Sequence, residues 1–141
     1  MDAQTPAVAR INQAVPFFHV RDMQASLRFY IDGLGGFMTK YWDPDGVVRW
    51  CWIELGQAAV MLQQWNSDWG EARKAGDGLS ICFMCDDAIG IWREAKRRGL
   101  DPSRPMVGNG LWVTSLTDPD GYRLDFESPT DAEEETEYEG D

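Results

Sequence analysis

The sequence predicts an α+β fold built from two tandem β-α-β-β-β modules. A strand-like run, an Asp cap and an amphipathic helix occur in this order twice, starting at Val15 and at Ser80. The two copies lie 65 positions apart, and the later hairpin turns keep nearly the same spacing, at Gly56-Gln57 and at Pro119–Gly121. A long internal period indicates a repeated structural unit. We therefore expect two copies of one module within a single compact domain.

The first module spans residues 14–64, and its first strand covers residues 14–20. Asp22 is a good helix N-cap, and the apolar residues at positions 23, 27, 30, 31 and 34 then fall on one helical face. Glycines at 33, 35 and 36 end this helix. Further strands are expected at 37–42, 47–55 and 58–64, with a turn at Asp43–Gly46 between the first two.

The second module spans residues 79–129 and repeats this order. Asp86 or Asp87 caps its helix, residues 101–107 form an irregular edge, and residues 111–117 and 122–128 form the last hairpin. The polar stretch 65–78 is expected to be the linker, with a helical turn at 67–74. Residues 1–13 form an N-terminal extension.

The charge of the chain excludes some partners. The net charge is −11, whereas nucleic acids and anionic membranes attract basic surfaces. Seven of the carboxylates lie in residues 130–141, which carry no base and are expected to be a disordered acidic tail. No apolar run approaches the ~20 residues of a membrane span, and residues 1–13 lack a signal-peptide pattern. We therefore expect a cytoplasmic protein.

The three cysteines are expected to be free thiols. Cys51, Cys82 and Cys85 are an odd number and lie within strand-like runs. The spacing of Cys82 and Cys85 is that of a redox or zinc pair. Residues three apart on a strand point to opposite faces, however, so buried free thiols are the preferred interpretation.

The motifs resemble those of the vicinal oxygen chelate superfamily, which contains glyoxalase I, bleomycin-resistance proteins and extradiol dioxygenases. The stretches that carry the resemblance are Pro16-Phe-Phe-His-Val-Arg-Asp22, Ser26–Tyr30, Leu34–Phe37, Glu54–Ala58 and Asp118–Phe126. The match covers about residues 11–129. The resemblance implies two modules whose mixed sheets curl around a cavity, usually in a homodimer.

In metal-using members of that superfamily, four strand positions supply His, Gln or Glu ligands to an ion in the cavity. The corresponding positions here hold Val15, Met61, Ser80 and Asp125. Only the Asp carboxylate is an ordinary ligand for a hard metal ion, and methionine prefers soft Cu(I). A shift of two residues would replace Met61 by Gln63, which still gives too few ligands. We therefore expect no metal and no cofactor.

His19 is the only histidine of the chain. Strand alternation places Phe17 and His19 on one face and Phe18 on the other, so the imidazole can look into the cavity. Either a rim histidine held by a hydrogen bond or a contact with a ligand is consistent with this position.

Tryptophans and carboxylates make up the rest of the predicted site. Trp50 and Trp52 share a strand face, and Trp112 lies in the equivalent strand of the second module, although packing roles remain open for them. Asp125 and Glu127 share another face. Aromatic rings and carboxylates together suit a planar or cationic ligand.

The sequence thus predicts a metal-free protein similar to the bleomycin-resistance branch, which sequesters an aromatic or cationic small molecule, such as an antibiotic, in a cleft of a homodimer. No catalytic residue is assigned. The predicted ligand-binding residues are Phe17, His19, Trp50, Trp52, Met61, Gln63, Ser80, Trp112, Asp125 and Glu127. The alternatives are a metal-dependent glyoxalase-type lyase, isomerase or dioxygenase, and a metal-free enzyme that uses His19 with a carboxylate.

Overall fold

The structure, a computed structural model, describes residues 10–72 and 75–141. The first module contains β1 (Phe17–Val20), α1 (Met23–Leu27), the π-helical η1 (Arg28–Gly33), β2 (Phe37–Trp42), β3 (Trp50–Leu55) and β4 (Ala58–Gln64). The linker contains a short 3-10 helix, η2 (Ser67–Trp69). The second module contains β5 (Ser80–Met84), α2 (Ala88–Arg97), β6 (Met106–Gly108), β7 (Leu111–Thr117) and β8 (Arg123–Pro129).

The two modules have the same sheet topology, which confirms the predicted repeat. The strand orders are β1-β4-β3-β2 and β5-β8-β7-β6, and in each sheet the first strand pairs in parallel with the fourth. The register of these parallel pairs agrees as well, because Phe17 pairs with Met61 and Cys82 pairs with Asp125. Met61 is therefore the structural counterpart of Asp125.

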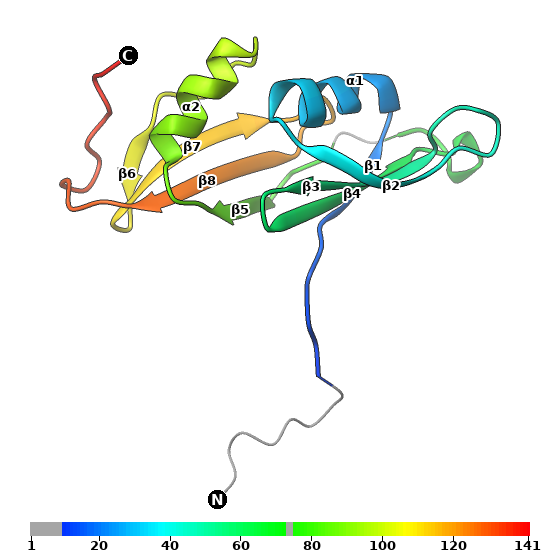
Figure 1. The fold of residues 1–141 in the computed structure, drawn as a ribbon, viewed down its shortest axis with the longest axis horizontal. Coiled ribbons are helices and arrows are strands. Elements are labelled where there is room, and N and C mark those ends of the chain that lie inside the picture. The colour runs from blue at the N-terminus through cyan, green and yellow to red at the C-terminus, as the bar shows by residue number, and fades with distance from the viewer. Residues whose placement is uncertain (1–9, 73–74) are drawn as a thin grey trace, which may run out of the picture.

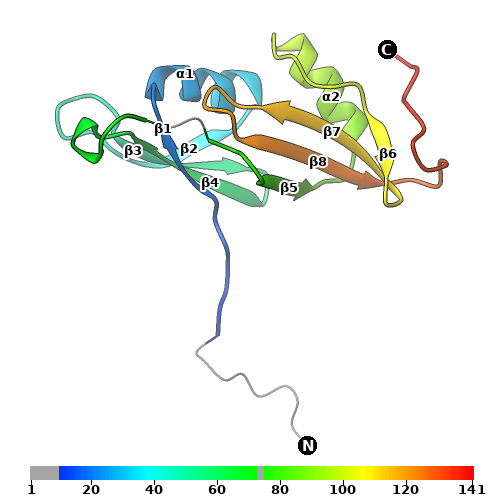
Figure 2. The same ribbon diagram turned by 180° about the vertical axis from the view of Figure 1, so that it is seen from behind.

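Both helices lie on the same side of the strands (Figures 1 and 2). The opposite side, which we call the helix-free face, carries no helix in the described part of the chain. Alternate side chains of β1 and β3 are buried under the helices, whereas β2 buries none, and the core lies between the two layers. The buried core residues are Phe18, Val20, Met23, Phe29, Tyr30, Cys51, Ile53, Val60, Leu62, Phe83, Ala95, Leu116, Leu124 and Phe126.

The predicted caps begin both helices. The Asp22 carboxylate accepts a hydrogen bond from the Ala25 amide at 3.2 Å, and Asp87, rather than Asp86, accepts from Gly90 at 2.9 Å. The first helix continues through the π-helical turns of η1 instead of remaining α-helical. Gly33 lies against Leu100 so closely that a Cβ atom would come within 2.8 Å of that side chain.

No helix of the described residues is long and apolar enough to cross a membrane.

The turn between β7 and β8 fastens the second module to the first. The Tyr30 hydroxyl donates a 2.8 Å hydrogen bond to the Asp118 carboxylate, and both groups are buried. The Arg21 backbone amide and guanidinium both donate to Asp120, at 2.9 and 3.0 Å. The Asp118 carboxylate also accepts from the amides of Asp120 and Tyr122. We call this set of contacts the inter-module clamp.

The clamp makes stability depend on pH. Burial raises the pKa of Asp118, although the hydrogen bond from Tyr30 acts in the opposite direction. A carboxyl group with a raised folded-state pKa binds its proton more tightly in the folded state. Its contribution to stability is therefore complete below the unfolded-state pKa and is lost as the pH rises through the folded-state pKa.

We predict that Tyr30→Phe lowers the free energy of unfolding by about 1–3 kcal/mol at pH 7, because a buried carboxylate oxygen loses its donor. The loss should shrink in acid, where Asp118 is protonated. Urea denaturation at several pH values measures both effects. Tyr41→Phe is the matched control, since Tyr41 is 60% exposed on β2. A loss of the same size in an Asp118→Ala background, where the acceptor is absent, would contradict this account.

Residues 130–141 do not form the disordered tail that their composition suggests. The Val107 amide donates to the carbonyl of Thr136, and the Glu135 amide donates to that of Val107, so the segment runs beside β6. The Tyr138 ring meets Trp92 and Trp112 edge-on, each at 5.8 Å between centroids. These aromatic contacts and backbone bonds fix a segment whose charge alone would favour disorder.

Basic side chains hold the same segment in place. Arg93 donates to the Tyr138 hydroxyl and to the carbonyl of Asp141, and Arg104 donates to the carbonyls of Tyr138 and Gly140. Arg93 and Arg104 are thus engaged in hydrogen bonds to the C-terminal segment of the same molecule.

We predict that Tyr138→Ala lowers the free energy of unfolding by about 1–2 kcal/mol, because two aromatic contacts disappear together. It should also expose Trp92 and Trp112 to acrylamide quenching. Both are measured by fluorescence, with Tyr41→Ala as the surface control. Equal stability and equal quenching of the two variants would show that the segment is not held by this ring.

Candidate functional site

The helix-free face collects nine of the ten predicted ligand-binding residues. Strand register arranges the side chains of the first sheet in two rows across this face. From β1 to β2 the rows are His19, Gln63, Trp50 and Trp42, and Phe17, Met61, Trp52 and Lys40. Antiparallel sheets with one uncovered face usually present polar residues there, whereas this face is rich in aromatic rings.

Trp50 and Trp52 lie half-buried on this face, while Cys51 and Ile53 between and beyond them are fully buried against the helices. The Lys40 ammonium sits 4.8 Å from the centre of the Trp52 ring. Lys40 thus forms a cation–π contact with Trp52, which shows that a ring on this face can bind a positively charged group.

His19 belongs to an aromatic cluster at one edge of the first sheet. Its imidazole stacks on Phe17 with 5.0 Å between ring centroids. Trp69 and Trp65 of the linker approach it edge-on at 5.4 and 6.2 Å. The imidazole therefore lies among aromatic rings, and no hydrogen bond or ion pair joins it to a carboxylate of the described residues.

The second sheet carries the polar half of the face. Asp125 is 8% exposed and accepts hydrogen bonds from the Ser115 hydroxyl at 2.6 Å and from Arg123 at 3.0 Å. Arg123 also donates to the Ser115 hydroxyl at 3.2 Å. Because Arg123 balances its charge, Asp125 is held in place and is less available to a cation.

Glu127 lies beside Asp125 on the same face and is half-buried. Ser80 is exposed at the other end of the face, where it pairs with Arg123. A hydrogen bond to Glu127, followed by burial and by the charges of the two carboxylates, raises the pKa of the Cys82 thiol to about 11. The thiol is therefore protonated and unreactive at neutral pH.

We predict that Cys82 alkylates slowly at pH 7.5, although its side chain is exposed, because little thiolate is present. Glu127→Gln should speed the reaction and move its pH midpoint from about 11 toward the ordinary value of 9. Iodoacetamide labelling followed by mass spectrometry, in a Cys85→Ser background, measures the rate. An unchanged rate would show that Glu127 does not control this thiol.

The residues at the superfamily's metal positions do not fit a metal ion. Within residues 10–72 and 75–141 there is no group of three His, Cys, Asp or Glu side chains that could hold one. Met61 occupies the place equivalent to Asp125, and Asp125 is engaged by Arg123. The Gln63 and His19 side chains that could extend the ligand set lie on the other sheet.

Trp112 is the exception among the predicted residues, and the expectation that it joins the others on this face is wrong. It shares the helix side of β7 with the buried Thr114 and Leu116, and its ring packs on Tyr138. The β7–β8 hairpin of the second module is one residue longer than the β3–β4 hairpin of the first. The paired residues Ile53 and Val60 lie seven positions apart, whereas Leu116 and Leu124 lie eight apart. A one-residue shift turns every side chain of a strand to the other face.

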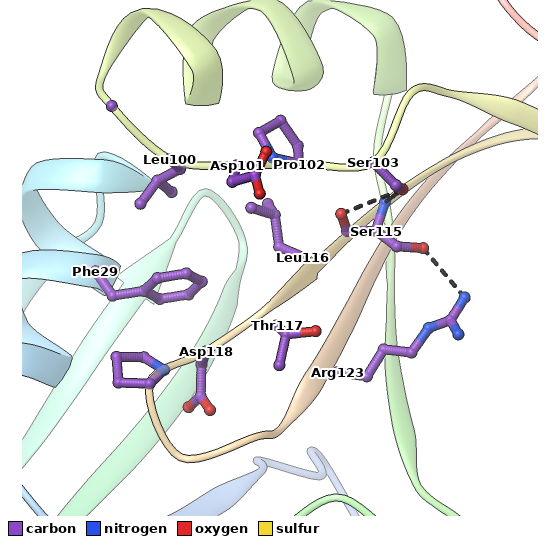
Figure 3. Close-up of a pocket in the computed structure, with 12 residues that line it drawn as sticks. Phe29, Leu100, Asp101, Pro102, Ser103, Ser115, Leu116, Thr117, Asp118 and Arg123 are labelled. Atoms are coloured by element: carbon purple, nitrogen blue, oxygen red, sulfur yellow. Dashed lines mark hydrogen bonds between the residues drawn. The ribbon is translucent and has the colours of Figure 1, made fainter.

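A cavity of about 740 Å³ borders this face at Ser115 and Arg123, but none of the ten predicted residues lines it. Figure 3 shows Phe29, Leu100 and Leu116 around it. Part of its polar lining is already engaged, since Ser103 bonds to Ser115 and Asp118 belongs to the inter-module clamp. We therefore place the candidate site on the helix-free face.

Sequence reasoning did not assign Lys40, Ser115, Phe37 and Met84 to this face. The period of two along β5 and β7 was a usable signal for Met84 and Ser115, but not for both Phe37 and Lys40 of β2. The β-bulge between Met38 and Lys40 disrupts that period in β2, and no sequence signal marks the bulge.

Comparison with known proteins agrees with the fold. The model of the Glyoxalase/Bleomycin resistance protein/Dioxygenase superfamily matches residues 10–126. The chain therefore belongs to this superfamily, as its motifs predicted. No curated protein matches the sequence.

Solved structures with the same fold include proteins that bind or resist antibiotics. A bleomycin resistance determinant encoded on the transposon Tn5 is 23% identical, covers 84% of this chain and 98% of its own, and has a TM-score of 0.66. A bleomycin-binding protein complexed with bleomycin is 21% identical over 85% and 100%, with a TM-score of 0.63. The fosfomycin resistance protein FosX from Mesorhizobium loti is 18% identical over 84% and 92%, with a TM-score of 0.61. At these identities the likeness shows the fold alone.

Proposed function

We propose that this protein binds an aromatic or cationic small molecule on its helix-free face without a metal ion, and that two copies close the site as a homodimer. The observation that carries the proposal is the chemistry of that face. Aromatic rings of the first sheet and the carboxylates of the second lie on the same side of the molecule, uncovered by any described helix.

The exposure of this face supports an interaction role. Phe37 is 74% exposed, Met84 66%, Trp42 55% and Phe17 45%. Large apolar side chains gathered on one face mark an interaction surface more often than an ordinary solvent surface. A second copy placed over the face would bury these side chains and would enclose the ligand between aromatic and acidic walls.

Two of the similar solved structures support the proposed ligand class. One similar structure is a bleomycin-binding protein in complex with bleomycin, and another is a bleomycin resistance determinant. Sequestration requires binding and no reaction, which agrees with the lack of a metal-ligand set among the described residues. A cytoplasmic location is part of the proposal, since all three cysteines are free thiols.

Tryptophan-fluorescence titration with a panel of planar and cationic antibiotics, bleomycin included, tests the proposal. We expect saturable quenching by at least one compound, and a Trp52→Ala variant should bind it about tenfold more weakly, which corresponds to ~1.4 kcal/mol. Trp112→Phe is the matched control, because Trp112 lies on the helix side of β7 and should leave binding unchanged.

Two further measurements separate this proposal from a metal-dependent enzyme. Metal analysis of protein purified without a chelator should find less than one divalent ion per chain, and light scattering should give the mass of a dimer. A stoichiometric metal that is lost on Asp125→Asn, or quenching by no compound of the panel, would contradict the proposed function.

A further inference from the structure

The internal repeat creates two equivalent junctions between the modules. At the first junction the β7–β8 turn meets the start of α1 and is closed by the inter-module clamp. At the second junction the β3–β4 turn meets the start of α2. The residues at equivalent positions can therefore be compared directly.

The second junction lacks every group of the clamp. The 65-residue period places Asp86 where the first junction has Arg21, and Ala95 where it has Tyr30. Counted from the paired strand residues, Leu55 takes the place of Asp118. Counted back from the paired residues Val60 of β4 and Leu124 of β8, Gly56 takes the place of Asp120. The buried hydrogen bond and the ion pair thus have no counterpart, and smaller or apolar side chains occupy their positions.

A cavity of about 530 Å³ remains at this second junction. Its wall includes the apolar side chains of Leu34, Leu55, Ile91 and the stacked pair Phe83 and Phe126, whose ring centroids lie 5.2 Å apart, together with polar groups such as Gln57. Phe83 and Phe126 are 8% and 6% exposed, so the cavity reaches the core. Cavities of about 300–1,000 Å³ with such walls are typical of small-molecule sites.

The charge at this cavity is negative. Asp86 lines the cavity, is exposed, and forms no salt bridge with any described residue. The nearby Arg98 guanidinium lies against Gly35 but is paired with Glu94 at 2.8 Å. Burial raises the pKa of Cys85, the other ionisable group of the lining, so this thiol is neutral at pH 7.

We propose that this second-junction cavity is a separate binding site for a small apolar molecule that carries an ammonium group. The apolar body fills the space against Phe83, Phe126 and Ile91, and the ammonium group meets the Asp86 carboxylate at the edge. This site does not share a predicted ligand-binding residue with the helix-free face.

The test uses 4-phenylbutylamine and 4-phenylbutanoate, which share a body and differ in the sign of their charge. In ¹H–¹⁵N NMR titrations of the full chain, the amine should shift the amide signals of Gly35, Gly56 and Ile91 in a saturable manner. The carboxylate should bind about two- to fivefold more weakly, as expected for the loss of one partly exposed ion pair.

Three variants make the test specific. Ala58→Trp fills the cavity and should abolish binding of both compounds, while Asp86→Asn should reduce only the preference for the amine. Trp52→Ala, on the helix-free face, should leave both affinities unchanged, which separates this site from the proposed function. If Ala58→Trp does not fold, the Asp86→Asn result and the position of the shifted signals decide. No saturable shifts at these residues, or equal affinity for the two compounds, would overturn the proposal.

Discussion

The hydrogen bond between Tyr30 and Asp118, two buried groups from different modules, is the contact on which the arrangement of the molecule depends. It joins the first helix to the last hairpin across a sequence separation of 88 residues. Arg21 adds a charged bond from the same region to Asp120. Removal of one partner leaves a buried carboxylate without compensation, which makes such pairs specific as well as stabilising. The position of one sheet beside the other, and therefore the continuity of the helix-free face, follows from this turn.

The two modules have kept one backbone plan and diverged in their surfaces. Met61 in the first module and Asp125 in the second occupy equivalent places, and each lies in a row with different chemistry. Aromatic side chains dominate the first sheet, and the hydrogen-bonded group of Ser115, Arg123 and Asp125 lies on the second. The same divergence closes one junction and leaves a cavity at the other. The repeated backbone thus carries two sheet faces and two inter-module junctions that differ in the chemistry of their side chains.

The sequence pattern was enough to predict the order of the elements along the chain, the Asp22 cap, and the strand face that Trp50 shares with Trp52 and Asp125 with Glu127. Trp112 shows where this reasoning ends, because one additional residue in a turn reverses a strand face and nothing in the local pattern reveals it. The C-terminal segment shows a second limit. Its composition predicts disorder, yet Tyr138 reaches Trp92 and Trp112, which lie 46 and 26 residues earlier in the sequence. Long-range contacts of this kind are invisible to composition.

The C-terminal segment also has a consequence for solubility during and after synthesis. An unpaired outer strand is a template on which another chain can add, and this is a common route to aggregates. Here Thr136 and Glu135 occupy the backbone groups of Val107 that would otherwise be open. Their neighbours Glu134, Glu137 and Glu139 repel a further acidic chain. Residues 134–139 thus cover the β6 edge of the second sheet with acidic side chains and hinder another chain from pairing there.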